Sequence, residues 1–144
     1  MEVIDIAYLK RCIQALEKAL EYLLQSKKDD IHYDLYRSAC IKEFEIIIEQ
    51  AGKLLKKCLK PYFSSTKKAD QLFFKDIFRH SAKHSIISLE ECERWLNYRD
   101  NRNQTSHDYG IEFAEQTLKL LPQFILDANQ LIIHIKRLND NQGL

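Results

Sequence analysis

Apolar residues recur at alternating steps of three and four along much of this chain, and this spacing most constrains its fold. Such a pattern places apolar side chains on one stripe of an α-helix, which must then pack against other helices. Only 3 glycines and 2 prolines occur among the 144 residues, where average usage would supply roughly 17. Because hairpins, barrels and glycine-rich phosphate loops need more turn residues than this, the sequence predicts an all-α protein.

Two long apolar stripes predict a pair of long helices in the first part of the chain. The first helix begins at Ile6 and covers about six turns. The second follows an N-cap at Asp29 or Asp30 and ends at Pro61, because the residue before a proline is pushed out of the helical region. The stripes consist of Ile6, Leu9, Ile13, Leu16, Leu20 and Leu23, and of Tyr33, Tyr36, Cys40, Phe44, Ile47, Ala51, Leu54 and Cys58.

Shorter helices are expected after a loop at residues 61–69. Asp70 is expected to cap a helix that carries Leu72, Phe73, Ile77 and Phe78 and breaks at residues 81–87. Ser88 and Glu91 then have the spacing of a capping box, which predicts a helix that extends to residue 102 or beyond. The residues expected to be buried on this helix are Leu89, Cys92, Trp95 and Leu96.

The last predicted helix follows Gly110 and contains Pro122, which should kink it or divide it in two. The whole pattern predicts an antiparallel bundle of four to five helices. We expect a single domain over residues 1–138 and a short polar tail over residues 139–144.

Charge and composition narrow the class of protein. A formal net charge of +1 argues against a protein that coats nucleic acid, which needs a broad basic field. No apolar run is long enough to cross a membrane, and the N-terminus lacks the pattern of a secretion signal, so we expect a cytoplasmic protein. The cysteines lack zinc-ligand spacing, and we interpret them as buried reduced thiols; they are Cys12, Cys40, Cys58 and Cys92.

The segment between Tyr98 and Tyr109 concentrates polar side chains, with two guanidiniums, two carboxylates, three amides and an imidazole. If the helix continues from Trp95, then Arg102 lies on the same inward-leaning face, where an arginine needs an anion or a carboxylate partner. His107 has a titration range suited to proton transfer. A helix C-terminus rich in polar caps is the alternative, and the spacing alone leaves both open.

Two weaker candidate sites lie upstream of this segment. His80 and His84 could share a helix face and bind a metal, but only Asp76 offers a carboxylate at matching spacing, which favours solvated histidines. A basic strip without any acid from residue 50 to 69 could attract RNA or an acidic partner, or could solvate a helix end and complement its dipole. The strip consists of Lys53, Lys56, Lys57, Lys60, Lys67 and Lys68.

The sequence Arg102-Asn103-x3-His107 matches the Arg-x4-His signature of HEPN domains. Tyr109 extends it to the Arg-x4-His-x-Tyr form of HEPN proteins that pair with MNT-type minimal nucleotidyltransferases. The chain also resembles, roughly over residues 6–135, the branch known as nucleotidyltransferase substrate-binding subunits. This wider resemblance is carried by Phe44-Glu45-x3-Glu49, Phe73–Arg79 and Trp95-Leu96, and the departures from it are Gly52, where a tryptophan is usual, and Gly110, where Asn or Asp is usual.

The resemblance implies an endoribonuclease toxin of a toxin–antitoxin pair, which acts as a homodimer without metal or cofactor. His107 would be the general acid/base for attack by a ribose 2′-hydroxyl, while Arg102 stabilises charge on the phosphate and Asn103 orients the site. The nearby-encoded MNT-type partner would adenylylate Tyr109 and silence the cleft. Further residues that could line this cleft, which would hold RNA or a nucleotide, are Arg99, Asp108 and Glu49.

Two other functional classes stay open at this point. Within the family, the chain could be a non-catalytic subunit whose cleft binds a nucleotide or the substrate of a two-component nucleotidyltransferase. Outside it, the chain could be a helical adaptor unrelated to HEPN proteins. Only the nuclease hypothesis requires that RNA be cut.

Overall fold

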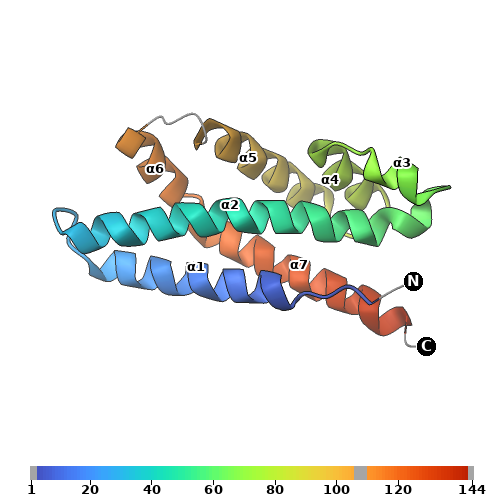
Figure 1. Cartoon of the computed structure of the whole chain (residues 1–144), viewed down its shortest axis with the longest axis horizontal. Coiled ribbons are helices and arrows are strands. Elements are labelled where there is room, and N and C mark those ends of the chain that lie inside the picture. The colour runs from blue at the N-terminus through green and yellow to red at the C-terminus, as the bar shows by residue number, and fades with distance from the viewer. Residues whose placement is uncertain (1–2, 106–109, 143–144) are drawn as a thin grey trace.

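The computed structural model describes residues 3–105 and 110–142. Within these ranges the regular structure is helical without strands, which confirms the predicted all-α class (Figure 1). The elements are α1 (Ala7–Gln25), α2 (Ile31–Leu59), the 3-10 turn η1 (Lys60–Tyr62), α3 (Thr66–Asp70), α4 (Phe74–Lys83), α5 (Leu89–Thr105), α6 (Gly110–Leu118) and α7 (Leu121–Gln142).

Helix α2 is the central element of the bundle. It contacts each of the other helices and the 3-10 turn. In Figure 1, α1 runs antiparallel along one side of α2, α7 crosses behind, and α4 and α5 lie on the other side. The arrangement is the antiparallel bundle that the apolar stripes predict, because stripes of this length are covered only when several helices surround them.

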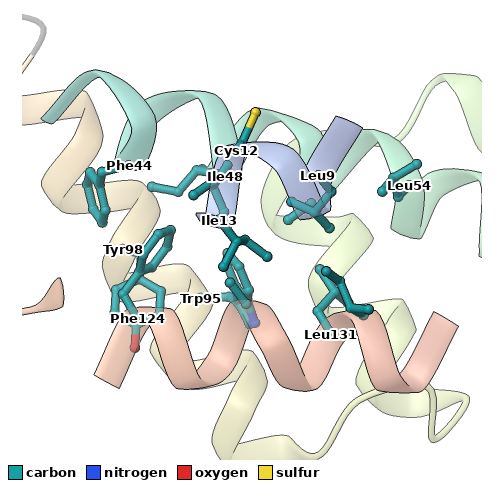
Figure 2. Close-up of a cluster of buried hydrophobic side chains, with 14 of the residues drawn as sticks. Leu9, Cys12, Ile13, Phe44, Ile48, Leu54, Trp95, Tyr98, Phe124 and Leu131 are labelled. Carbon is teal, nitrogen blue, oxygen red and sulfur yellow. The ribbon is translucent and has the colours of Figure 1, made fainter. Parts of the chain in front are cut away.

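Aromatic rings from three helices fill the centre of the core. The Phe44 ring of α2 lies 4.7 Å from the Phe124 ring of α7, and both are fully buried. Trp95 of α5 packs edge-on against Phe124 at 5.5 Å, in the geometry that aromatic pairs favour. Figure 2 shows these rings between α2, α5 and α7. The apolar positions of the predicted stripes therefore converge on one core.

Two predicted helix starts are confirmed by their caps. The Asp30 side chain accepts a hydrogen bond from the backbone N–H of His32 at 2.9 Å at the start of α2. Before α5, the Glu91 N–H donates to the Ser88 hydroxyl at 3.0 Å, and the Ser88 N–H donates to the Glu91 carboxylate at 2.9 Å. Local side-chain chemistry thus determines where both helices begin.

The boundaries between residues 61 and 74 differ from the prediction. Residues 66–69, predicted as loop, form α3 together with Asp70, because the Ser65 hydroxyl accepts from the Lys68 N–H at 3.2 Å and caps a single turn. Asp70 is the last residue of α3 instead of the cap of the next helix. Helix α4 begins at Phe74, after Phe73, which makes no side-chain cap.

Helix α4 also continues past the break predicted at residue 81. The Ser81 hydroxyl donates to the Ile77 carbonyl at 2.7 Å, which satisfies this buried side chain inside the helix. On the next helix, Leu89 was predicted to be buried but is 69% exposed, because it occupies the first turn of α5 on the solvent side. Cys92 and Trp95 are buried as predicted.

Seven α-helices in the described ranges exceed the four to five that were predicted. One extra helix is α3, and the other arises because the segment that contains Pro122 is divided into α6 and α7. Pro122 is the second residue of α7, where its missing N–H leaves no helical hydrogen bond unmade. Division at the proline was one of the two predicted outcomes.

The polar tail predicted from residue 139 is helical in its first part. Helix α7 continues through Gln142. Asn139 donates to the Ile4 carbonyl and accepts from the Ile4 N–H, both at 2.9 Å. This pair joins the end of α7 to the segment before α1, so the helical register persists beyond residue 138.

All four cysteines are buried and free of disulfides. Burial raises the pKa of the Cys40 thiol to about 11 and that of the Cys58 thiol to about 12. Both groups are therefore neutral and poorly nucleophilic at physiological pH. The interpretation of the cysteines as buried reduced thiols is confirmed.

Asp127 on α7 is a buried carboxylate that joins α7 to α5. Arg94 donates two hydrogen bonds to it, each of 2.8 Å, and the Tyr98 hydroxyl donates a third. Burial, and then the hydrogen bond to Asp127, raise the pKa of Tyr98, which keeps this hydroxyl protonated as a donor. Asp127 is only 3% exposed, so these hydrogen-bond partners stabilise its negative charge in place of water.

We expect Asp127→Ala to lower the free energy of unfolding by about 2–4 kcal/mol, because it leaves Arg94 and Tyr98 without their acceptor. Chemical denaturation followed by circular dichroism measures this change. The matched control is Asp140→Ala, which removes an exposed carboxylate from the same helix and should change stability by less than about 0.5 kcal/mol. Equal effects of the two substitutions would contradict the role of Asp127.

Candidate functional site

Three of the predicted site residues meet where α5 crosses α2. Arg99 and Arg102 lie one turn apart on α5, and both guanidiniums approach the Oε1 atom of Glu49 on α2. Arg99 forms a hydrogen bond with this oxygen, and the Nη2 atom of Arg102 lies 3.5 Å from it. Arg102 was expected to meet an anion or a carboxylate, and Glu49 is a carboxylate partner of this arginine. We call these three residues the arginine cluster.

The arginine cluster is anchored on an aromatic ring. The guanidinium carbon of Arg99 lies 4.3 Å from the centre of the Phe74 ring of α4, which adds a cation–π attraction to the ion pair. Phe74 in turn packs against Gly52, where a Cβ atom would lie only 2.8 Å from the Phe74 Cε2 atom. The resembled branch usually has a tryptophan at this position. Gly52 instead leaves room for the Phe74 ring.

The arginine cluster brings two guanidiniums to the same carboxylate oxygen. Its side chains are partly open to solvent, with 22% of Arg99, 28% of Arg102 and 41% of Glu49 exposed. The adjacent Lys75 is paired with Asp100 at 2.7 Å and adds no further charge. A solvent-accessible pair of neighbouring guanidiniums is suited to bind an anion such as a phosphate.

Hydrogen bonds brace the helices on both sides of the motif segment. The buried Thr117 hydroxyl of α6 donates to the Asn101 side chain of α5 at 2.9 Å. The Tyr33 hydroxyl of α2 donates to Glu115 of α6 at 2.7 Å. Burial, and then the Glu115 carboxylate, raise the pKa of Tyr33 to about 12, so this hydroxyl stays a donor. Sequence analysis missed these pairs because each partner lies on a different helix.

Gly110, at the start of α6, stands where the resembled branch usually has Asn or Asp. Gly110 has a φ of +82°, in the left-handed region that glycine adopts readily and Asn or Asp tolerate. An added Cβ atom would meet nothing within 4 Å. The constraint at this position is therefore the backbone conformation, which both residue types can satisfy.

The remaining motif residues are placed only in part. Asn103 lies on α5 next to Arg102 and is exposed. His107, Asp108 and Tyr109 lie outside the described residues, so their roles stay predictions.

The two upstream histidines pack against aromatic rings. The His84 ring stacks on Tyr62 at 4.0 Å with an interplanar angle of 17°, and the His80 ring lies edge-on to Phe63 at 5.2 Å. Among the residues that the structure describes, no group of three potential ligands could hold a metal ion. Ring packing therefore accounts for both histidines.

No helix in the described ranges is both long and apolar enough to span a membrane.

Comparisons with known proteins agree with the fold and with the resemblance. The family model described as "Nucleotidyltransferase substrate binding protein like" matches residues 4–137. A Haemophilus influenzae protein named "Probable ribonuclease HepT" is 28% identical over 106 residues, which cover 74% of this chain and 71% of that protein. The solved structure of HI0074 from Haemophilus influenzae, described as the fold of a substrate binding domain of a nucleotidyltransferase, superposes with a TM-score of 0.78 at 24% identity, over 92% of this chain and 99% of that one.

If Glu49 competes with an external anion for the arginine cluster, Glu49→Gln should strengthen anion binding, because the substitution removes the negative charge that lies beside both guanidiniums. Isothermal titration with inorganic pyrophosphate measures this affinity. Since the cluster is partly exposed, the free energy of unfolding should change by less than about 1 kcal/mol. The control Glu17→Gln removes an exposed carboxylate from α1 and should leave affinity unchanged, whereas weaker binding by Glu49→Gln would show that Glu49 instead positions the arginines.

Proposed function

Because the chain belongs to the nucleotidyltransferase substrate binding protein-like family, we propose that it is a HEPN-type endoribonuclease controlled by an MNT-type nucleotidyltransferase. The observation that carries the proposal is the arginine cluster, which places the guanidiniums of Arg99 and Arg102 side by side and partly exposed to solvent. The name of the Haemophilus influenzae relative, "Probable ribonuclease HepT", supports the same chemistry.

In the proposed reaction, Arg102 binds the RNA phosphate at which the strand is cleaved. His107 takes the proton from a ribose 2′-hydroxyl, and the 2′-oxygen attacks the adjacent phosphorus. Arg102, with Arg99 beside it, stabilises the charge on the non-bridging oxygens. The bond to the 5′-oxygen breaks, and this leaving oxygen takes a proton from the imidazolium of the site. The products are a 2′,3′-cyclic phosphate and a 5′-hydroxyl end.

Glu49 has a defined role in this proposal. In the absence of RNA it occupies the position between the guanidiniums of Arg99 and Arg102. A phosphate that enters the site forms charge-assisted hydrogen bonds with the same donors. The site as a whole would consist of two copies of the motif that face each other in a homodimer, with Asn103 hydrogen-bonded to the bound strand and Asp108 at its edge.

Control by the partner would act on Tyr109. The phenol oxygen attacks the α-phosphate of ATP bound to the nucleotidyltransferase, and pyrophosphate leaves. The AMP group left on Tyr109 carries a negative charge and a bulky nucleoside, which would compete with RNA for the arginine cluster.

A second candidate function uses the same cluster without cleavage. In this case the chain is the substrate-binding subunit of a two-component nucleotidyltransferase, and Arg99 and Arg102 hold the phosphate of a nucleotide substrate. The description of the matching family favours this candidate. The two candidates differ in one observable, which is whether RNA is cut.

Expression of the chain alone in bacteria should arrest growth and fragment cellular RNA. His107→Ala and Arg102→Ala should each abolish both effects, because they remove the proton-transfer group and the phosphate-binding group. The matched control Arg11→Ala removes an exposed arginine from α1 and should stay toxic. Fragments should end in 2′,3′-cyclic phosphate, and cleavage by the purified protein should persist in EDTA. Harmless expression with intact RNA would contradict the nuclease and favour the substrate-binding subunit.

Co-expression with the nucleotidyltransferase encoded next to this chain should restore growth. Intact-mass spectrometry should then show the added mass of AMP on the chain, and peptide mapping should place it on Tyr109. Tyr109→Phe should carry no AMP and should not be silenced by the partner. Modification at another tyrosine, such as the exposed Tyr8, would contradict the proposed acceptor.

A further inference from the structure

Four lysines form a continuous stripe on the last turns of α2 and the first residue of η1, and we call them the lysine track. Their spacing of i, i+3, i+4 and i+7 places them on one face of the helix. Glu49 lies one turn before the first of them on the same face, so the stripe starts beside the arginine cluster. The lysine track consists of Lys53, Lys56, Lys57 and Lys60.

The charge of the lysine track is not neutralised within the described part of the chain. No acidic residue occurs from residue 50 to 69. Elsewhere on the surface Lys18 pairs with Glu21 and Lys75 pairs with Asp100, but no described carboxylate forms an ion pair with a lysine of the track. Lys67 and Lys68 on α3 add two exposed charges near its end. A local positive field of this kind attracts polyanions even when the net charge of the protein is close to zero.

An exposed aromatic ring lies just beyond the last lysine. Tyr62 follows Lys60 and Pro61 in the 3-10 turn η1 and is 50% exposed. One face of its ring is held against His84, with ring centres 4.0 Å apart and nearly parallel planes. A ring that is oriented in this way and still half exposed can stack a nucleic-acid base.

We propose that the lysine track and Tyr62 bind the extension of an RNA strand whose reactive phosphate lies at the arginine cluster. This inference rests on the proposed nuclease function and specifies its substrate as a polynucleotide instead of a mononucleotide. At roughly 1.5 Å per residue, the 11 residues from Glu49 to Lys60 cover about 16 Å. A strand must therefore continue for several nucleotides beyond the cleaved bond to reach Tyr62.

The observations favour RNA over an acidic protein as the occupant. Lysine side chains alone would suit either polyanion, since each is a point charge. The stacked and exposed Tyr62 ring, however, matches a planar base, and the track is continuous with guanidiniums suited to phosphate. A basic groove that ends on an aromatic platform is how proteins bind single strands without sequence preference.

The test measures RNA binding in the full-length His107→Ala protein, which prevents cleavage. The probes are a fluorescent single-stranded oligonucleotide long enough to follow α2 and a dinucleotide that can reach only the arginine cluster. Lys57→Gln with Lys60→Gln should weaken oligonucleotide binding and reduce the slope of log K against log[salt] by about 1.4, since each phosphate contact to a single strand contributes about 0.7. Dinucleotide binding should not change.

Tyr62→Ala should weaken oligonucleotide binding by roughly tenfold, as expected for the loss of one stacked base, and should leave the salt slope unchanged. The matched control is Lys27→Gln with Lys28→Gln, which removes two exposed lysines between α1 and α2 at the opposite end of α2. This control should retain full affinity. Circular dichroism and melting temperature confirm that each variant is folded.

The outcomes separate this inference from the proposed function. If the chain does not cleave RNA but oligonucleotide binding depends on the lysine track and Tyr62, the track is an RNA-binding surface and only the nuclease is wrong. If the chain cleaves RNA but the track variants bind the oligonucleotide like the wild type, the inference is overturned and the nuclease stands. If those variants bind the oligonucleotide normally but no longer bind the nucleotidyltransferase, the track is a protein-docking surface, which also overturns the inference.

Discussion

The packing of α2 is the constraint on which the rest of the structure depends. This helix has 29 residues, and its buried positions can be covered only if other helices surround it. The aromatic core at Phe44, Trp95 and Phe124 sets how α5 and α7 approach it. Once α5 is placed by these rings and by Asp127, its polar face near Arg99 must meet α2 at Glu49. The candidate site is therefore a consequence of core packing, because the packed helices fix the positions of its side chains.

The balance of charge at that crossing connects structure to function. Two guanidiniums meet at one carboxylate oxygen and stay partly exposed to solvent. The Phe74 ring also packs against the Arg99 guanidinium. This contact restricts the rotamers of Arg99 before an anion binds, and it therefore reduces the side-chain entropy that is lost on binding. A phosphate that displaces Glu49 gains two charge-assisted donors at little cost in ordering. In the proposed function, the lysine track would add affinity only for ligands long enough to reach it.

Two local departures from the resembled family are explained by neighbours and by backbone geometry. Gly52 leaves space for the Phe74 ring, because an added Cβ atom would lie 2.8 Å from the Phe74 Cε2 atom. Gly110 stands where the backbone takes a positive φ and space is open. Gly52 therefore affects the packing of Phe74 under the arginine cluster, whereas Gly110 preserves the backbone conformation at the start of α6. Neither alters the residues of the motif.

Sequence alone determined the helical class, a cap at Asp29 or Asp30, the capping box at Ser88, a kink or division at Pro122 and the need of Arg102 for an anion or a carboxylate. These features depend on contacts three or four residues apart or on one residue's backbone preference, and such information is local. The single-turn α3 and the extension of α7 to Gln142 escaped prediction, because short caps and one distant pair with Ile4 decide them. Only the tertiary structure showed that Glu49 is the partner of Arg102, that Asp127 joins α5 to α7, and that Tyr62 stacks on His84. Those pairs lie on different elements, so they exist only once the helices have packed and their faces have been brought into register.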